Sequence, residues 1–281
     1  MRDISTVTFF LIIANIIVSY NGFTKASFFD DYKFDVDKIL IGKDYKRLIT
    51  SGFLHVSWTH LIFNIISLYA FSAPVQSNFG PYGFFFIYMI SLLGGSLLDL
   101  YIHRNHGDYT AAGASGAVCG IIFAAIAVYP GMDIGIIFLP IFIPGWIFGI
   151  VYVLYTIYGI KSDSDNIGHA AHLGGALIGM FVALLMQPIA FRANYVTILI
   201  ILIPILIFMY FLINKPSFLL IGNKSIASPK KYYSIEHKYH EERVARQKEI
   251  DRILEKINKR GVDSLTKQEK QMLDEYAKRL R

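Results

Sequence analysis

The residues in this sequence best suited to chemistry are one serine and one histidine, each inside an apolar run. Ser115 lies in the stretch Gly-Ala-Ser-Gly at 113–116, which opens such a run. The first N–H groups of a helix have no intrahelical partner, so a carbonyl could approach both the hydroxyl and the backbone there. A serine nucleophile also needs a base. His172, in the glycine-rich stretch 169–175, is the best partner, and the pair predicts proteolysis within a bilayer.

A second polar pair, His60 and Asn64, is spaced four residues apart and therefore shares one face of a predicted helix. Polar side chains are costly in a membrane and usually face protein or a water-filled cavity. Taken alone, the pair would be read as hydrogen-bonding glue between helices. Beside Ser115 and His172, the imidazole and the carboxamide are instead donors suited to a developing oxyanion.

The composition indicates that these residues belong to a polytopic membrane protein. Of the 281 residues, 54% are hydrophobic and only 17% are charged, and a soluble domain could not bury so many long apolar runs. The single cysteine, Cys119, excludes an intramolecular disulfide. The net charge of +6 belongs to the C-terminal region, because residues 215–281 carry 17 Lys and Arg against 10 Asp and Glu.

Seven apolar runs are long enough to cross a membrane. They cover residues 4–20, 54–71, 82–102, 113–129, 145–160, 167–186 and 195–213. The first could be a signal peptide, but no small-x-small cleavage pattern follows it, which favours a retained helix. We expect Pro74 to end the second span. The seventh has no polar group suited to a site and is predicted to be an added span.

The connections are less regular. Residues 21–46 form a mixed-charge, aromatic connector suited to the membrane interface. Residues 134–144 contain two prolines and are predicted to be an extended connection, with Pro144 preceding the fifth helix. Residues 239–260 and 266–279 have the patterns of two soluble helices, with Ser264 or Thr266 as the cap of the second. This tail could be a solvated appendage or a docking surface for anionic lipid or a partner.

Small residues recur every four positions on the fourth and sixth predicted spans, which lets helix backbones approach closely. The stripes are Gly116, Gly120 and Ala124 on one span and Ala171, Gly175 and Gly179 on the other. Ordinary membrane packing explains such stripes equally well. In either case, the close approach would bring Ser115 and His172 within hydrogen-bond reach.

Three motifs in this order resemble the rhomboid intramembrane serine proteases, over about residues 1–188. They are Gly113-x-Ser115-Gly116, His60-x-x-x-Asn64, and Ala171-His172-x-Gly174-Gly175-x-x-x-Gly179. Arg47-Leu48-x-Thr50 before Phe53-Leu54-His55 is similar to the end of the rhomboid first loop, and His55 also falls on a family position. The fold that the resemblance implies is a six-helix bundle, here with a seventh transmembrane helix and a short helical tail.

The resemblance implies the site as well. Ser115 is similar to the nucleophile and His172 to the general base, while His60, Asn64 and the Ser115 backbone N–H correspond to the oxyanion site. No metal or cofactor is implied. The family often has an aromatic residue four positions after the serine, stacked on the base; Cys119 stands there, so we expect a less firmly held base. His169 is expected to face solvent or bind a loop.

The leading hypothesis is therefore that this protein cleaves protein substrates in or near their transmembrane segments. We expect it to be a multi-pass protein of a cell membrane, namely the bacterial plasma membrane. No nucleic-acid partner is expected, and the sequence leaves the oligomeric state open. The alternative is a non-proteolytic rhomboid-fold protein that binds client helices. A transporter would require charged residues or broken helices near the middle of the membrane, and none is evident beyond the polar residues described above. A zinc protease would require the motif H-E-x-x-H, which is absent. The topology that the resemblance implies would place residues 215–281 on the external side of the membrane, whereas the distribution of Lys and Arg favours the cytosolic side.

Overall fold

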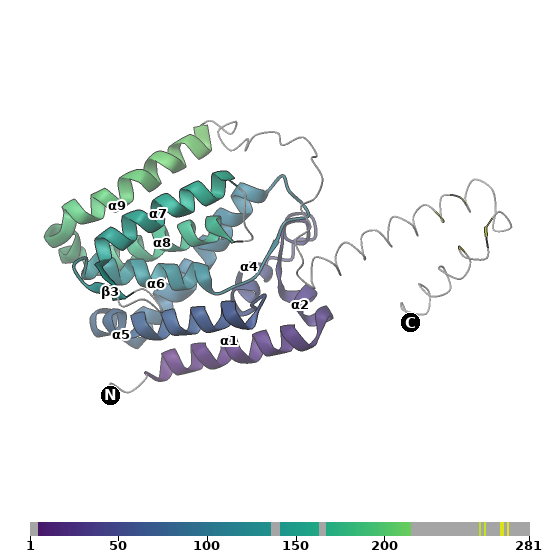
Figure 1. The fold of residues 1–281 in the computed structure, drawn as a ribbon, viewed down its shortest axis with the longest axis horizontal. Helices are drawn as coiled ribbons and strands as arrows, with labels where there is room; N and C mark the ends of the chain where they lie inside the picture. Colours follow the sequence, from purple (N-terminus) through teal and green to yellow (C-terminus); the bar gives the residue numbers. More distant parts are fainter. Residues whose placement is uncertain are drawn as a thin grey trace. The chain divides into compact units, whose positions relative to one another are not determined.

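The computed structural model describes residues 5–135, 141–162 and 167–214, together with five residues of the tail, which are Ile253, Lys256, Leu265, Thr266 and Glu269. The chain divides into two compact units, Met1–Asn223 and Lys224–Arg281. The first unit contains the predicted spans and both halves of the predicted site (Figure 1).

Within the described residues, five helices are long and apolar enough to span a membrane, and one further apolar helix is shorter. The long helices are α1 (Thr6–Thr24), α5 (Trp58–His103), α7 (Gly145–Ser162), α8 (His169–Met186) and α9 (Pro188–Asn214), and the short one is α6 (Ser115–Val128). α5 has 46 residues with a non-helical Gly80 inside it, so it supplies two crossings. The prediction of an all-α polytopic membrane protein is confirmed.

The boundary predicted at Pro74 is wrong. α5 begins at Trp58, where the Ser57 side chain caps the helix by accepting the N–H of His60 at 3.2 Å. The helix then continues through Pro74 and breaks only at Gly80, which has a φ of 67°. A proline removes one intrahelical hydrogen bond, and a membrane helix tolerates that loss when its neighbours support it. The positive φ of glycine reverses the chain locally and separates the two crossings.

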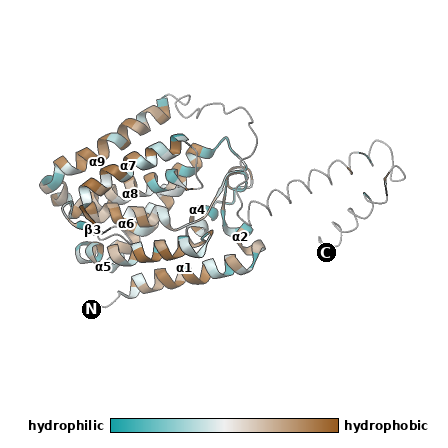
Figure 2. Cartoon of the chain, viewed as in Figure 1, coloured by the Kyte–Doolittle hydropathy of each residue, from teal (hydrophilic) through white to brown (hydrophobic). Residues whose placement is uncertain are grey.

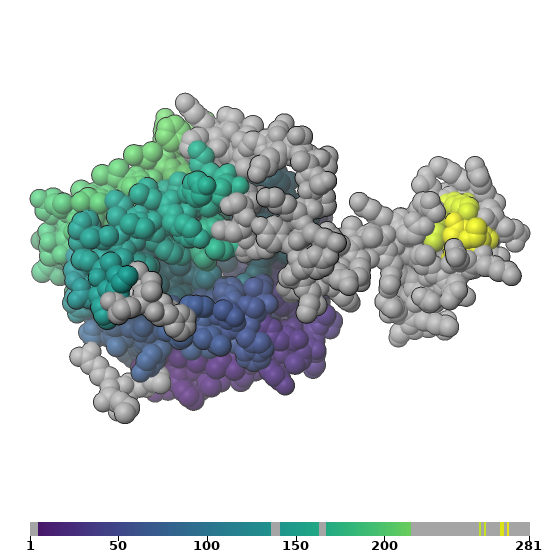
Figure 3. All heavy atoms as spheres, viewed as in Figure 1, coloured from purple at the N-terminus to yellow at the C-terminus, as the bar shows by residue number. Residues whose placement is uncertain are grey.

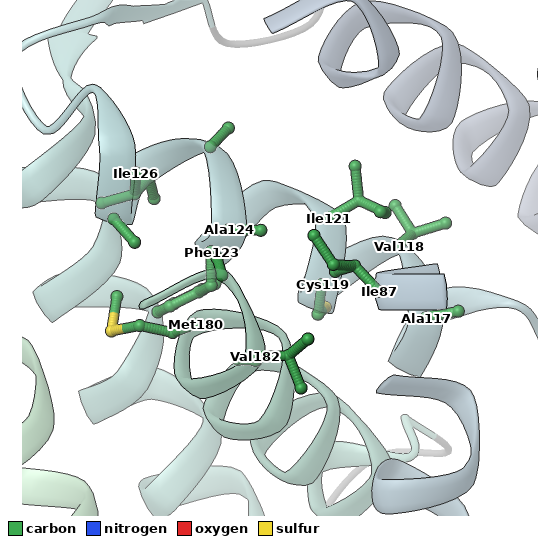
Figure 4. Close-up of a cluster of buried hydrophobic side chains, with 14 of the residues drawn as sticks. Ile87, Ala117, Val118, Cys119, Ile121, Phe123, Ala124, Ile126, Met180 and Val182 are labelled. Carbon is green, nitrogen blue, oxygen red and sulfur yellow. The ribbon is translucent and has the colours of Figure 1, made fainter. Parts of the chain in front are cut away.

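The short helix α6 lies at the centre of the bundle, with α5 on one side and α8 on the other (Figure 1). Eleven of its 14 residues are buried. Figure 4 shows apolar side chains gathered around this helix, with Ile87 of α5, Phe123 of α6 and Met180 of α8 all fully buried. The structure therefore encloses the start of α6, where Ser115 lies, within packed helices.

The glycines of α6 and α8 face each other, as the two small-residue stripes predicted. A Cβ built on Gly175 would collide with the backbone oxygen of Gly116, and one built on Gly179 would collide with that of Gly120. Ala171 also lies close, since its carbonyl oxygen would be 3.1 Å from a Cβ at Gly116. Any larger side chain at these contacts would push α8 away from α6.

The connector between α1 and α5 is folded rather than extended. It contains α2 (Ala26–Tyr32), β1 (Phe34–Asp35), α3 (Val36–Leu40), α4 (Arg47–Thr50) and the 3₁₀ turn η1 (Ser51–Phe53). β1 pairs antiparallel with β2 (Thr110–Ala111), just before the Gly-Ala-Ser-Gly stretch. The buried Arg47 donates to the carbonyls of Asp30 and Lys33 and to the carboxylate of Asp44. This connector thus fixes the approach to α6.

Between α6 and α7 the chain forms a hairpin of β3 (Asp133–Gly135) and β4 (Phe142–Pro144), paired antiparallel. Residues 136–140, including one of the two prolines in the predicted connection, lie outside the described residues. α7 begins at Gly145, directly after Pro144, as predicted. A proline at this place suits a helix start, because its fixed φ and missing N–H cost nothing there.

α9 adds a seventh span at the edge of the bundle. Its buried side chains follow helical spacing, at Ile198, Ile201, Ile205, Phe208 and Leu212, while large apolar residues such as Ile203 and Tyr210 are exposed on the other sides. Figure 2 shows the apolar character of α9, and in Figure 3 α1 and α9 occupy opposite edges of the helical body. An apolar outer surface of this kind suits contact with lipid.

The described residues of the tail include one predicted helix cap. The N–H of Thr266 donates to the Glu269 carboxylate at 2.7 Å, and the N–H of Glu269 donates to Thr266 Oγ1 at 3.3 Å. This reciprocal pair is a capping box. Lys256 pairs with Glu269 at 2.8 Å. The remainder of the helices predicted at 239–260 and 266–279 lies outside the described residues.

Candidate active site

The structure brings together the serine and the histidine that the sequence singled out. Ser115 is the first residue of α6 and His172 lies in the first turn of α8, and the gap between Ser115 Oγ and His172 Nε2 is 2.7 Å. The glycine contacts between these two helices set that distance. A hydroxyl hydrogen-bonded to an imidazole nitrogen is the arrangement required for general-base activation of a nucleophile.

Gly113 allows the His60 ring to lie against the backbone beside Ser115. It has a φ of 153°, in the region that favours glycine. A Cβ at this position would come within 2.5 Å of His60 Cε1 and 3.5 Å of Ser115 Oγ. The His60 ring therefore lies against the Gly113 backbone and close to the serine. The role of His60 as an oxyanion donor stays a prediction, and the structure brings its ring beside the serine.

The backbone before Ser115 is held by two acceptors. The N–H of Gly113 donates to the carbonyl of Ser51 at 3.0 Å, and the N–H of Ala114 donates to His55 Nε2 at 3.4 Å. The N–H groups of Ser115 and Gly116 follow in the first turn of α6, where no intrahelical acceptor exists for them. Unpaired N–H groups at a helix start are backbone donors suited to a negative oxygen.

Asn64 lies one turn after His60 and is 7% exposed. Its side-chain nitrogen donates to the carbonyl oxygen of His60 at 3.0 Å. An amide nitrogen carries two hydrogens, so this bond does not exhaust its capacity as a donor. The structure thus places Asn64 on the face of α5 that carries His60, as predicted, and its described bond lies within α5 and does not itself join two helices.

His55 supports the site through a defined tautomer. Ser19 Oγ lies 3.0 Å from the carbonyl oxygen of Phe53 and 2.8 Å from His55 Nδ1. The serine has one proton, which must go to the carbonyl, so His55 Nδ1 carries a hydrogen and donates to Ser19. Nε2 is then free to accept from Ala114. Burial, followed by the neighbouring His60, lowers the pKa of His55 to about 3, which agrees with a neutral ring.

This lowered pKa predicts acid sensitivity. An unfolded histidine binds its proton near pH 6.5, whereas folded His55 does not until about pH 3, so between these values the unfolded state holds more protons and acid favours unfolding. Each pH unit in that window should cost about 1.4 kcal/mol. Measured between pH 6.5 and 5, the unfolding free energy of the purified protein should therefore fall by about 2 kcal/mol more than that of His55→Gln. Equal acid sensitivity of the two proteins would contradict this prediction.

Tyr152 of α7 was missed by the sequence analysis. Its hydroxyl is 3.0 Å from His172 Nδ1 and 3.0 Å from Cys119 Sγ, and its ring lies at 24° to the imidazole with the ring centroids 6.3 Å apart. An aromatic side chain thus contacts the histidine after all, although it comes from α7 rather than from position 119. Tyr152 belongs to no motif, and nothing in its helix separates it from an ordinary packing aromatic.

The prediction that His169 faces solvent or a loop is wrong. The residue is 4% exposed, and its ring occupies the space that a side chain at Gly159 of α7 would fill. Tyr155 meets the ring edge-on, with centroids 5.1 Å apart. His169 therefore joins α8 to α7 by packing. Among the described residues, no group of three or more His, Cys, Asp or Glu is arranged to hold a metal ion.

Two models of known protein families match parts of this chain. The model of the Rhomboid domain matches residues 42–189, which include Ser115, His172, His60 and Asn64. A second model, of a family of unknown function (DUF6576), matches residues 233–279.

Three relatives match the helical body. The chain is 30% identical to RHOMBOID-like protein 12, mitochondrial, of Arabidopsis thaliana, over 60% of this chain and 54% of the relative. It is 29% identical to Rhomboid protein 1, mitochondrial, of Saccharomyces cerevisiae, over 50% and 43%. It is 26% identical to the rhomboid protease GluP of Bacillus subtilis, over 62% and 33%. The chain thus spans between a third and just over half of the length of these relatives.

Proposed function

This chain belongs to the rhomboid family, and on that premise we propose that it is an intramembrane serine endopeptidase. The observation that carries the proposal is the 2.7 Å contact between Ser115 Oγ and His172 Nε2 at the start of a buried helix. A family member that has lost proteolysis would not need both groups, nor their contact. A relative that is named a protease, GluP of Bacillus subtilis, lends further support.

The proposed reaction is acyl transfer. His172 Nε2 takes the proton of Ser115 as Oγ forms a bond to the carbonyl carbon of the scissile peptide. The displaced electron pair moves to the carbonyl oxygen, which the Ser115 N–H, His60 and Asn64 stabilise by hydrogen bonds. The imidazolium of His172 gives its proton to the leaving amine nitrogen as the C–N bond breaks. Water then attacks the acyl-enzyme with the same proton transfers and restores the serine.

The depth of the site favours substrates inside the membrane. α6 has 14 residues, which makes it about 21 Å long at 1.5 Å per residue, whereas the hydrocarbon core is about 30 Å thick. A span this short, enclosed by longer helices, begins below one membrane surface. The peptide bond cleaved would accordingly lie in or near a transmembrane segment. By family resemblance, small residues at the cleavage point and locally unwindable helices are the proposed preference.

We propose three parts for the chain, a catalytic domain at 1–188, an added transmembrane helix at 189–214 and a basic helical tail at 215–281. The Rhomboid-domain match ending at residue 189 and the separate match at 233–279 favour this division. The chain is a multi-pass membrane protein. The relatives named above are mitochondrial in two cases and bacterial in one, so the expected bacterial plasma membrane gains no particular support.

Reconstitution tests the proposed function. The full chain in liposomes should cleave single-span model substrates that carry small residues in an unwindable helix, and mass spectrometry should locate the cut in or near the span. A fluorophosphonate probe should label the same preparation. Absence of both cleavage and labelling from folded protein would exclude the protease and leave the alternative, a rhomboid-fold protein that binds client helices.

Asn64→Ala provides a test of the oxyanion site. A donor aimed at charge that develops only in the transition state should affect turnover more than substrate affinity. Because His60 and the Ser115 N–H remain, the loss should be partial, on the order of ~10²-fold in kcat. Probe labelling of Ser115 should weaken but stay detectable.

Thermal stability measured on the same Asn64→Ala preparation separates the two interpretations of this residue. If its role were only structural, Asn64 would contribute to folding through its bond to the His60 carbonyl within α5, so the variant would melt earlier while each folded molecule kept its activity. Undiminished kcat per folded molecule would remove Asn64 from the site.

A further inference from the structure

Beyond the serine and histidine, a continuous set of hydrogen-bonding contacts extends to α7. Cys119 Sγ lies 3.0 Å from Tyr152 Oη, which lies 3.0 Å from His172 Nδ1. His172 Nε2 in turn lies 2.7 Å from Ser115 Oγ. The four groups come from three helices, α6, α7 and α8. Whatever fixes the proton on one nitrogen of His172 determines what the other nitrogen can do.

The proton arrangement follows from the chemistry of each group. For His172 Nε2 to accept the serine proton, the hydrogen of the neutral ring must be on Nδ1. Nδ1–H then donates to the oxygen of Tyr152. The tyrosine proton must point elsewhere, and Cys119 Sγ is the other polar atom that the described residues place within hydrogen-bond distance of it. Sulfur is a weak acceptor, but it meets this need.

We propose that Tyr152 is a positioning residue that holds His172 in its Nδ1–H tautomer, with Cys119 as the acceptor of the tyrosine proton. This inference rests on the proposed protease function. Tyr152 stabilises the imidazolium through a neutral oxygen lone pair. A carboxylate in the same place would have to be buried as a charge, which costs several kcal/mol in an apolar interior. A phenol provides the acceptor without that cost.

Packing holds the phenol in position. Phe148, one turn earlier on α7, stacks on the Tyr152 ring at 15° with centroids 5.5 Å apart, and Phe123 of α6 lies at 5.9 Å. Phenylalanine at position 152 would preserve these contacts and lose only the hydroxyl. Tyr152→Phe therefore separates positioning from packing. Tyr158→Phe is the matched control, because it removes a hydroxyl from the same helix at a side chain that is 69% exposed.

Kinetics of the full chain in liposomes provide the first test. Tyr152→Phe should lower kcat about tenfold, the effect of losing one net hydrogen bond, with KM and melting temperature nearly unchanged. Tyr158→Phe should match the wild type. Cys119→Ala should also lower kcat, because the tyrosine proton would turn toward Nδ1, and Cys119→Ser, which restores an acceptor, should recover it. Full kcat in Tyr152→Phe would overturn the proposal.

The second test does not depend on cleavage. Nitrogen-15 NMR of histidine-labelled protein, with His172 assigned from its alanine variant, distinguishes the two tautomers by the shifts of the ring nitrogens. The wild type should show Nδ1–H, and Tyr152→Phe should shift the population toward Nε2–H. An Nε2–H ring in the wild type would overturn the inference even in an active enzyme. Absence of cleavage and labelling in the wild type would instead refute the proposed function.

Discussion

Ser115→Ala should abolish cleavage of a model transmembrane substrate and labelling by a fluorophosphonate probe, while the protein stays folded. Removing Oγ removes the atom that would form the covalent bond, and no backbone donor can replace it. The loss of turnover should be at least about 10⁴-fold, as for other serine nucleophiles. Alanine is slightly smaller and suits the start of a helix, so the melting temperature should change little.

Ser96→Ala is a suitable control for this experiment. Ser96 is a buried serine of α5, 7% exposed, and is not part of the proposed site. The probe should label the Ser96 variant as it labels the wild type, and mass spectrometry should place the adduct on Ser115. Cleavage retained in purified Ser115→Ala, or an adduct on another serine, would mean that the nucleophile has been misidentified.

The sequence predicted the core of the site because local motifs specify it. The stripe containing Gly175 and Gly179 implied that α8 packs tightly against α6, and the structure has those glycines against Gly116 and Gly120. Ser115 and His172 each occupy a fixed place relative to a stripe. Once the two helices touch along these glycines, the distance between the two side chains follows. The sequence pattern and the observed packing agree here because the single interface between α6 and α8 determines the distance between Ser115 and His172.

Residues on α7 could not be predicted in the same way. Tyr152 reaches His172, and Gly159 makes room for His169, but no motif in residues 145–162 indicates which side of this helix faces α8. Apolar residues surround the whole of a membrane helix, so hydrophobic periodicity does not mark the buried side. That uncertainty also explains the wrong prediction for His169. The residues that pack against His169 depend on the rotation of α7 about its axis, and the sequence pattern does not indicate that rotation.

The end of the second span was missed for a related reason. Pro74 was expected to stop the helix because proline lacks an N–H and strains the preceding turn. In the structure the break comes at Gly80, where φ is positive. A glycine followed by Pro81 is the stronger signal, since the glycine adopts the reversing conformation and the proline begins the next helix well. The composition of this stretch alone did not indicate which of these residues ends the helix.

The second large effect is expected for His172→Ala. This variant loses the only group within 2.7 Å of Ser115 Oγ that the described contacts offer as a proton acceptor. Without it the serine stays protonated, and turnover should fall by at least about 10⁴-fold. Nucleophile and base act as one unit, so the Ser115→Ala, His172→Ala double variant should be no worse than either single variant. Kinetics of the three proteins on one substrate measure this non-additivity.

His169→Ala is the contrasting variant on the same helix. His169 fills space beside Gly159 and Tyr155, so its truncation should lower stability by about 2 kcal/mol through the cavity that remains. Activity per folded molecule should stay largely intact, because His172 keeps its contact with Ser115. Specific activity and melting temperature on the same preparations separate the two histidines. Should His169→Ala be inactive and His172→Ala active, the base would be His169 and the start of α8 would have to be turned relative to α6.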